Sequence, residues 1–410
     1  MAKEEKKAPK LRFNGYTNDW EQVKLEKIAA FSKGKDYSKL DLKRKGYPIF
    51  LYGQMYTDYR YKIVETSTYA SLKKDAVVSN GNEIVIPSSG ETSVDIARAS
   101  WIAQKGIILG SDLNIIRPTS SVHPLFLALS LSNNQVKYNL AKVAQGNSIV
   151  HLYNNNLKKV NIYFPNIVEQ NKIGNILNSI SNCINLHERK CEELALIKKA
   201  LLQKLFPKKD EVRPEVRYKN FSDAWEQRRL GEVADVRDGT HDSPKYINEG
   251  YPLLTSKNVG DGYINYDDVK YVSENDYVQI NKRSKVDVND ILMGMIGTIG
   301  NLALIREEPD FAIKNVALIK HTSNFDYQFL FQELQTSAIS KELLSGMDGG
   351  TQKFVSLKKI RNLSVMLPSE NEQKKIGSYL MRFDSLIALH QRKLEKLKQL
   401  KKFLLQNMFI

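Results

Sequence analysis

The chain has 410 residues, 42% of them hydrophobic, which is enough for two or three domains with cores of their own. Its formal net charge of +15, from 61 basic and 46 acidic side chains, indicates a polyanionic partner, with nucleic acid ahead of an acidic membrane or an acidic protein. A soluble surface that is merely basic is the alternative.

The cysteines and the apolar segments argue against two classes of protein. Cys183 and Cys191 lie eight residues apart in one predicted helix, a spacing that fits neither a disulfide within the helix nor a zinc site. The charged N-terminus lacks the apolar core of a signal peptide, and the longest apolar stretches, such as 124–131 and 291–297, are too short to span a bilayer. We therefore expect a soluble protein of the reducing cytoplasm.

The first region, residues 1–164, is predicted to be mixed α and β. Short β-branched runs between clusters of Gly, Asn, Ser and Pro predict strands at 83–87, 113–117 and 160–164. The second region, residues 207–367, has counterparts of all three.

These counterparts are predicted strands at 290–293, 316–320 and 363–367. The segment 82–85 aligns with 289–292, and each is followed by a predicted turn glycine, Gly90 and Gly297. The two regions should therefore share one fold, while their loops share little. One scaffold with two sets of loops suits two readers of different targets.

A long helix follows each region, predicted over 165–206 and 368–410. The second helix repeats the first at a constant separation of 203 residues, as between Gln170 and Gln373. Apolar residues recur on both at alternating steps of four and three, which is the pattern of a coiled-coil seam. These positions are Ile173, Leu177, Ile180, Ile184, Cys191, Leu194, Leu201 and Leu205 in the first, and Ile376, Leu380, Phe383, Ile387, Leu394, Leu397, Leu404 and Met408 in the second.

Polar residues interrupt both stripes at matching positions: His187 matches His390, and Lys198 matches Lys401. Two ordinary amphipathic helices on separate domains would explain the apolar stripes but not these matched exceptions. We therefore predict that the two helices pair with each other and that the four polar residues fix the register of the coiled coil.

The link after the first helix is short, so the second region should begin at the far end of that helix, and the second helix should return antiparallel. A helix of about 34 residues is ~50 Å long at ~1.5 Å per residue. The predicted fold class is α+β: two similar domains joined by two long helices packed as an antiparallel coiled coil, with the pseudo-two-fold symmetry that a homodimer would otherwise supply.

The sequence lacks several motifs that catalysis would need. It contains no Pro-Pro pair, as a base methyltransferase motif would need, and no phosphate-binding loop with the Gly-Lys-Ser/Thr ending. The run 294–300 is rich in glycine but wrongly spaced for a dinucleotide site, which favours a tight turn over a backbone approach to phosphate. The segment Glu372-Gln373-Lys374 resembles the end of a nuclease motif, and we interpret it as a solvent-facing helix start. The six histidines lack metal-ligand spacing.

We therefore predict no catalytic residue, no metal site and no cofactor in this chain. What remains is a set of polar, basic and glycine-bearing loops suited to base edges and phosphates, although any single one also fits an ordinary surface turn. In the first region the candidates for DNA binding are Lys33, Lys35, Tyr37, Gln54, Tyr56, Ser89, Thr92, Gln145 and Asn147. In the second they are Arg237, Thr240, His241, Lys245, Lys257, Asn258, Thr298, Gln352 and Lys353.

The duplicated architecture carries a family resemblance. Both helices start with Pro-x3-Glu-Gln-x-Lys-Ile-Gly, at 165–174 and 368–377, and end with Leu-Leu-Gln before an aromatic residue, Phe206 and Phe409. Trp-Glu-Gln-x2-Leu occurs at Trp20 and again at Trp225, and the second region contains an Asp-Gly-Thr-His loop starting at Asp238. With these motifs the chain resembles the specificity subunit of type I restriction–modification enzymes over nearly its whole length.

The resemblance implies a division of labour. Residues 1–164 and 207–367 would be target-recognition domains, each reading half of a bipartite asymmetric DNA site, and helices 165–206 and 368–410 would set the spacer between the half-sites. The helices would also dock two modification subunits, which bind S-adenosylmethionine and methylate adenine. Two restriction subunits would use ATP and Mg²⁺ to translocate and cleave the DNA. Half-sites one helical turn apart would lie ~34–36 Å from centre to centre.

Three other readings remain open at this point. They are a self-sufficient nuclease or methyltransferase, a specificity subunit of a system without restriction subunits, and a coiled-coil adaptor that binds nucleic acid without sequence readout.

Overall fold

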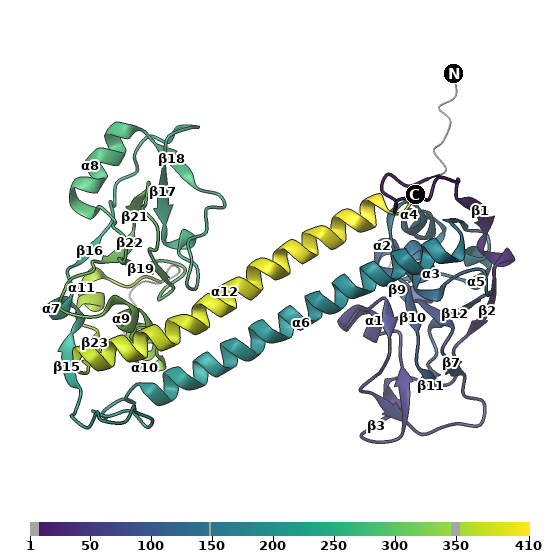
Figure 1. Ribbon diagram of the computed structural model, residues 1–410, viewed down its shortest axis with the longest axis horizontal. Coiled ribbons are helices and arrows are strands. Elements are labelled where there is room, and N and C mark those ends of the chain that lie inside the picture. Colours follow the sequence, from purple (N-terminus) through teal and green to yellow (C-terminus); the bar gives the residue numbers. More distant parts are fainter. Residues whose placement is uncertain (1–7, 147–148, 346–352) are drawn as a thin grey trace. The chain divides into compact units, whose positions relative to one another are not determined.

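Two long helices, α6 (Ile167–Leu205) and α12 (Glu370–Asn407), are the largest elements of the computed structural model (Figure 1). Each begins two residues after its predicted start. The structure describes residues 8–146, 149–345 and 353–410. No helix of these described residues is both long and apolar enough to cross a bilayer.

The chain divides into two units. Unit 1 comprises the residues up to His187 together with Lys393–Ile410, and unit 2 comprises Glu188–Arg392. Each unit therefore contains the start of one long helix and the end of the other.

Within each unit the helix start and the helix end pack together. In unit 1, Leu177 and Ile184 of α6 share a core with Leu404 of α12. In unit 2, Leu205 of α6 shares a core with Leu380 of α12. Since residues near the start of one helix meet residues near the end of the other, the antiparallel pairing is confirmed inside each unit. The predicted seam positions are all buried or half-buried.

Unit 1 contains two five-stranded sheets. The central sheet has, in spatial order, β2 (Ala29–Lys33), β12 (Leu113–Pro118), β8 (Glu83–Pro87), β10 (Ser100–Ile102) and β5 (Lys62–Ile63). The second sheet has β3 (Leu42–Lys43), β6 (Tyr69–Ala70), β4 (Tyr47–Phe50), β11 (Lys105–Leu109) and β7 (Val78–Asn80). Two further pairs are β1 (Glu21–Lys24) with β14 (Asn161–Phe164), and β9 (Ser89–Gly90) with β13 (Val150–His151).

The shorter helices of unit 1 are η1 (Leu25–Lys27), η2 (Lys39–Asp41), α1 (Gln54–Thr57), α2 (Ser93–Ile96), α3 (Pro124–Leu131), α4 (Asn134–Val143) and α5 (Asn154–Leu157). Helix α3 is apolar almost throughout, and seven of its eight residues are buried. It shares the core of unit 1 with the central sheet and the start of α6.

Unit 2 repeats this arrangement with fewer strands. Its central sheet has β16 (Val236–Asp238), β22 (Val316–Ile319), β19 (Ile291–Gly294) and β20 (Leu302–Leu304), and its second sheet has β18 (Lys270–Val272), β17 (Tyr251–Thr255) and β21 (Ala312–Lys314). The remaining pair is β15 (Glu226–Arg229) with β23 (Ser364–Leu367). The helices are α7 (Leu230–Val233), η3 (Ser256–Asn258), α8 (Glu274–Ser284), α9 (Tyr327–Glu333), α10 (Ser337–Leu344) and α11 (Leu357–Arg361).

The strand directions agree between the units. The neighbours in the four matching central strands are antiparallel in both. In the second sheets β4 runs parallel to β11, as β17 does to β21. All six strands predicted from β-branched runs are present, which confirms the shared fold. The central strand β8 is fully buried, as its continuous apolar run requires.

Of the two glycines predicted to lie in turns, Gly297 does so. Gly297 has a φ of +74°, in the left-handed region that favours glycine. The prediction for Gly90 is wrong, because Gly90 lies in β9 and pairs with Val150 of β13. A Cβ at Gly90 would lie 2.6 Å from the Tyr56 hydroxyl, so close packing rather than a turn requires the glycine.

A cluster of three aromatic rings anchors a helix end in each unit. In unit 1, Trp20 and Phe126 lie 5.6 Å apart, and Phe409, just after α12, lies 5.4 Å from Phe126. In unit 2, Trp225 lies 5.6 Å from Phe329, and Phe206, just after α6, lies 5.3 Å from Phe329. These three rings match Trp20, Phe126 and Phe409 of unit 1. The Trp–Phe contacts are edge-to-face and the Phe–Phe contacts are stacked or tilted, and such contacts add to the stabilisation that comes from burial of apolar area.

The helix starts are docked by buried polar contacts, so the prediction that Glu372 and Gln373 face solvent is wrong. Glu372 is 0% exposed and accepts two hydrogen bonds of 2.8 Å from the Arg217 guanidinium. This bidentate pair raises the pKa of Arg217. Gln373 accepts a hydrogen bond from the Asp326 backbone and donates one to the Pro368 carbonyl, both at 2.9 Å.

Unit 1 has the same contacts at its own helix start. The Arg12 guanidinium donates to Glu169 at 2.8 Å and 2.7 Å, and Gln170 bridges the His123 backbone and the Pro165 carbonyl at 2.8 Å each. The repeated Glu-Gln pair therefore attaches each long helix to the domain that precedes it.

Candidate nucleic-acid interface

The Asp-Gly-Thr-His loop after β16 is held rigidly. A Cβ at Gly239 would lie 2.3 Å from the Ile313 carbonyl oxygen, so only glycine fits there. His241 Nδ1 lies 2.7 Å from Asn315 Oδ1, and His241 Nε2 lies 2.8 Å from Asp238 Oδ2. The hydrogen bond to Asn315, followed by that to Asp238, raises the pKa of His241. Both ring nitrogens of the exposed imidazole are therefore engaged within the loop, and its protonated form is paired with the Asp238 carboxylate.

Ser256, in η3, connects three loops of unit 2. Its hydroxyl donates to the Asn315 carbonyl at 2.6 Å and accepts from the backbone N–H groups of Met295 and Ile296 at 2.9 Å and 3.2 Å. The Thr298 hydroxyl donates to the Ser256 carbonyl. The glycine-rich run is therefore a tight turn packed against η3, the interpretation that its spacing favoured.

Residues of η3 and of strands β17, β18 and β21 line a small basic pocket of about 160 Å³, which we call the lysine pocket after Lys257, Lys270 and Lys314. Among the described residues that line it, Asp268 is the one acid. Lys257 lies 2.8 Å from Asp268 and lowers the pKa of that carboxyl group. Lys270 lies 4.3 Å from the ring centre of Tyr246. Three ammonium groups against one carboxylate suit a phosphate.

Two predicted contact residues of unit 2 have structural roles instead. Asn258 is 2% exposed, and its side chain accepts a hydrogen bond from the Thr255 backbone at 2.9 Å and donates one to the Asn265 carbonyl at 3.0 Å. The hydroxyl of Thr298 is used within the turn, as described above. Polar capping residues look like surface contacts in the sequence because both uses favour short polar side chains.

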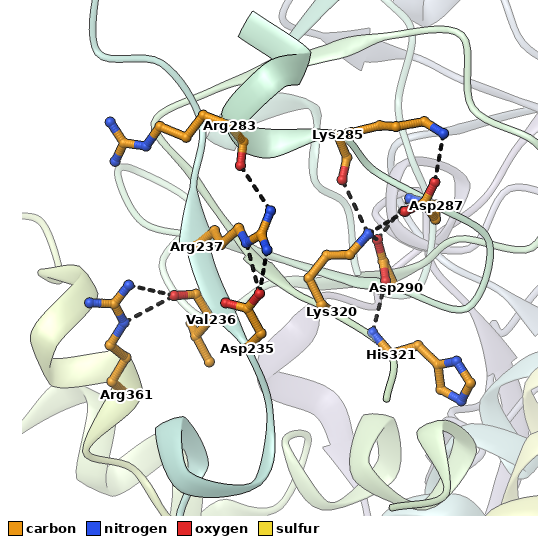
Figure 2. A network of polar contacts seen from close by, with 10 residues as sticks. All are labelled: Asp235, Val236, Arg237, Arg283, Lys285, Asp287, Asp290, Lys320, His321 and Arg361. Carbon is orange, nitrogen blue, oxygen red and sulfur yellow. Dashed lines mark hydrogen bonds and ion pairs between the residues drawn. The ribbon is translucent and has the colours of Figure 1, made fainter. Parts of the chain in front are cut away.

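Arg237 is exposed, but its guanidinium contacts its own domain (Figure 2). It lies 2.6 Å from the Asp235 carboxylate and donates to the Arg283 carbonyl at 3.2 Å. The hydrogen bond to Asp235 raises the pKa of Arg237. Arg237 is therefore a weaker candidate for DNA contact than the lysine pocket.

The rest of the network in Figure 2 supports the central sheet. Lys320 lies 2.6 Å from Asp290 and 2.5 Å from Asp287, and Asp290 also accepts from the His321 backbone at 2.8 Å. Unit 1 has an equivalent pair, Arg117 with the fully buried Glu83, at 3.1 Å. Carboxylates at the start of β8 and β19 thus tie the sheet to a cation on the neighbouring strand.

The other predicted residues of unit 2 are exposed or lie outside the description. Lys245 and Lys353 are exposed, and Thr240 is half-buried and accepts from the Asp242 backbone at 3.1 Å. A β-bridge between Ile296 and Phe354 places Lys353 next to the glycine-rich turn. Gln352 lies outside the described residues.

In unit 1 the predicted cation Lys33 lies beside two stacked rings, His151 and Tyr153. Lys33 lies 5.7 Å from the ring centre of Tyr153, which stacks on His151 at 6.0 Å. Gln145 is exposed and pairs with His151 through its backbone. Lys35 is exposed nearby in sequence, and Asn147 lies outside the described residues.

Tyr56 and Ser89 meet at a second place in unit 1. The Tyr56 hydroxyl donates to the Ser89 carbonyl at 3.1 Å, and the Arg98 guanidinium lies 4.7 Å from the Tyr56 ring centre. Burial raises the pKa of Tyr56 to about 12. Thr92 caps α2 by accepting from the Asp95 backbone at 3.1 Å.

Two other candidates of unit 1 serve the fold. The prediction for Tyr37 is wrong: it is 2% exposed, and its hydroxyl donates to the Ser71 carbonyl at 2.9 Å and accepts from the Lys73 backbone at 2.7 Å. Gln54 accepts from the Leu51 backbone at 2.8 Å and donates to Thr66 at 3.1 Å.

The structure places further candidate residues beside the predicted ones, which the sequence analysis did not single out. They are His151 and Tyr153 in unit 1, and Tyr246, Lys270 and Lys314 in unit 2. The alternation His151-Leu152-Tyr153 was a usable signal. Lys270 and Lys314 were not, because only the pairing of β17 with β18 and β21 brings them together.

The matched polar residues of the long helices have different surroundings. Lys198 is buried and lies 2.6 Å from Asp384 of α12 and 2.7 Å from Gln335. Lys401 lies 5.1 Å from the ring centre of Tyr61 and lines a pocket of about 300 Å³ in unit 1. His187 and His390 are half-buried. A role in register stays a prediction for all four.

Two observations bear on other chemistry. Across the described ranges, no group of three or more His, Cys, Asp and Glu side chains is arranged to hold a metal ion. Cys183 and Cys191 are free thiols.

Comparison with known proteins gives the same family for both halves. The family model described as "Type I restriction modification DNA specificity domain" matches residues 17–196 and 222–399. The specificity subunit of the type I restriction enzyme MjaVIII from Methanocaldococcus jannaschii is 25% identical to this chain over 398 residues, which cover 94% of this chain and 90% of that protein. The EcoBI specificity subunit of Escherichia coli is 23% identical over 252 residues, 56% of this chain and 52% of that protein.

A solved structure has a similar fold. The S subunit of a type I restriction–modification system from M. genitalium superposes with a TM-score of 0.66 at 19% identity, covering 98% of this chain and 99% of that one.

Proposed function

The chain belongs to the family of type I restriction–modification DNA specificity domains, and from this we infer that it is the subunit that selects the DNA sequence in a type I restriction–modification enzyme. The observation that carries the inference is that the specificity model matches twice, once in each half. Specificity subunits are not catalytic, so methylation and cleavage belong to partner subunits.

We propose that the two domains read different half-sites of one bipartite site. The domains share their sheets and their aromatic anchors, but the surfaces offered to DNA differ. Unit 2 offers the lysine pocket and His241, whereas unit 1 offers Lys33 beside the stacked rings of His151 and Tyr153. Two different surfaces on one repeated frame suit an asymmetric target, whereas a true homodimer is confined to palindromes.

The long helices are proposed to set the spacer and to dock the modification subunits. Each unit exposes apolar side chains on its helix segments at repeat-related positions: Leu186 and Leu400 in unit 1, and Leu389 and Ile197 in unit 2. Exposed apolar residues at matching positions are what two copies of one partner would need. We therefore propose two modification subunits for each chain.

The remaining assignments rest on the family alone. S-adenosylmethionine is proposed to bind the modification subunits, and ATP and Mg²⁺ two restriction subunits. The assembly is proposed to work in the cytoplasm, where its DNA is.

Methylome sequencing tests the proposal. A host without DNA methylation would express the chain with its modification subunit, and a control host the modification subunit alone. The expected result is a bipartite N6-methyladenine motif that disappears in the control. A well-expressed complex that methylates no motif would contradict it. If that complex then bound DNA in a salt-dependent way without sequence preference, a nucleic-acid adaptor would be the better description.

A further inference from the structure

A single leucine stands out on the surface of unit 1. Leu40, in the 3-10 helix η2, is 97% exposed, more than any other large apolar side chain among the described residues. It lies just before β3, which Figure 1 shows at the end of unit 1 remote from α6. Leu42, Tyr47 and Leu72 of the same region are also exposed. We call η2 and its flanking residues 38–47 the tip.

The tip is held in place by its own hydrogen bonds. Ser38 and Asp41 form a capping box, in which the Ser38 backbone donates to Asp41 at 2.8 Å and the Leu40 backbone donates to the Ser38 hydroxyl at 3.2 Å. Lys73 lies 2.7 Å from Asp41 and 4.6 Å from the ring centre of the buried Tyr37. Leu40 therefore projects from a braced turn.

The surroundings of Leu40 are basic. Four exposed cations lie within the tip: Lys39, Lys43, Arg44 and Lys45. Lys73 and Lys74 follow on the strand connection beside it, since β3 pairs with β6. Asp41 is the one acidic side chain within the tip, and it is engaged by Lys73. An exposed leucine ringed by cations suits a partner that carries negative charge outside and an apolar interior.

We propose that Leu40 is a wedge that enters a DNA groove and partly unstacks one base step of the half-site that unit 1 reads. This rests on the proposed function. Leucine is one of the side chains that DNA-bending proteins insert between base pairs, and flanking Lys and Arg residues hold the phosphates on either side. Such a wedge selects sequence through deformability, since pyrimidine–purine steps unstack more easily than others.

Unit 2 has no such wedge at the corresponding position. Tyr47-Pro48 of β4 matches Tyr251-Pro252 of β17, so Lys43, which pairs with Tyr69, matches Ile247, which bridges Tyr271. The residue three positions earlier is the exposed Leu40 in unit 1 and the half-buried Pro244 in unit 2. The wedge therefore acts on one half-site only, which gives the experiment an internal reference.

The experiment uses the complex of the full chain with its modification subunit and a duplex that carries the methylated motif. 2-Aminopurine, whose fluorescence rises on unstacking, replaces bases one at a time along both half-sites. We expect at least a threefold rise at one step of a single half-site, lost in Leu40→Ala and kept in Leu40→Met. Because Leu40 is fully exposed, Leu40→Ala should leave the fold intact. Leu344→Ala, an exposed leucine of unit 2, is the matched control.

The outcomes separate the wedge from the proposed function. A complex that binds its motif tightly without a rise at any step, or with a rise that Leu40→Ala leaves unchanged, overturns the wedge while the proposed function stands. Loss of the modification subunit from Leu40→Ala in the absence of DNA also overturns it, because the tip would then be a protein contact. If the wild-type complex selects no motif, the proposed function falls and the wedge with it.

Discussion

The two units use the same contacts to hold the helix ends and different contacts at one polar position of the seam. In unit 2, Lys198 is buried against Asp384, which also accepts a hydrogen bond from Gln332 at 2.6 Å. The repeat-related residues in unit 1 are Lys401 and Ser181, and a pocket of about 300 Å³ lies beside them. Strict symmetry is thus kept at the aromatic anchors and Arg–Glu pairs but not at this position.

The difference indicates what each contact does. Docking a helix on its domain is the same task in both units, so both use an arginine and a glutamate with the same geometry. Unit 1 has Ser181 where unit 2 has Asp384, so the two ends of the coiled coil differ in sequence at this position, which favours one register and disfavours pairing between copies of the same half.

The largest expected effect comes from the aromatic anchors. Phe206→Ala and Phe409→Ala should each lower the free energy of unfolding by about 3–5 kcal/mol, because each removes a buried ring from a three-ring cluster. Denaturant unfolding followed by hydrogen exchange of each unit would measure both. The geometry predicts similar losses, so a near-neutral result for either one would break the symmetry claimed for the anchors.

The seam should respond unequally. Asp384→Ala leaves the Lys198 ammonium buried without its carboxylate and should cost about 3 kcal/mol. Ser181→Ala, the matched change in unit 1, should cost under ~1 kcal/mol. Thermal unfolding of both variants is the measurement, and equal losses would show that the ion pair is not the source of the asymmetry.

Glu333 of α9 makes the stability of unit 2 depend on pH. Burial raises the pKa of Glu333 from 4.5 to about 8, and among the described residues its Oε2 atom has no partner. Between these values the folded state keeps a proton that the unfolded state has lost, so the contribution of Glu333 to stability is greatest below pH 4.5 and declines as pH rises to about 8.

Glu333→Gln should remove this decline, which amounts to at most ~1.4 kcal/mol per pH unit. Unit 1 has the uncharged Ser130 at the repeat-related position and serves as the internal control. The measurement is denaturation from pH 5 to 8.5 with hydrogen exchange to separate the units. A variant that keeps the slope of the wild type would refute the assignment to Glu333.

The smallest expected effects concern DNA affinity. Lys257→Gln or Lys314→Gln should weaken binding by about 1 kcal/mol and reduce the salt dependence by about one counterion each. Tyr153→Ala in unit 1 should weaken binding without changing the salt dependence, because it removes an aromatic surface rather than a charge. Lys285→Gln, an exposed lysine outside the pocket, is the control. Titrations at several salt concentrations would show equal slopes for all variants if the lysine pocket did not contact phosphate.

Much of the frame could be predicted because its signals are local. The apolar run of β8 and the four-three stripes of the long helices specify buried strands and paired helices wherever they occur. The burial of Glu372 could not be predicted in this way, since its partner Arg217 is 155 residues away. The exposure of Glu and Gln at a helix start is the usual outcome, and only the tertiary contact reverses it.

The interface residues were predicted less well for a related reason. Tyr37 and Asn258 stand in polar, loop-like segments, yet their hydrogen bonds hold those loops together. Lys270 and Lys314 become neighbours only through strand pairing. Composition identifies loops that suit DNA. It does not distinguish side chains that form hydrogen bonds within a loop from side chains that point away from it into solvent.

The central claim is that the two domains recognise the half-sites and that the long helices set the spacer between them. A matched deletion in the long helices tests it most directly. Removing 191–197 from α6 and 394–400 from α12 takes one heptad from each, at repeat-related positions, and keeps Lys198 and Lys401. Methylome sequencing would compare the methylated motif of this variant with that of the wild type. The account predicts unchanged half-sites separated by a shorter spacer. Changed half-sites, or an unchanged spacer, would contradict it.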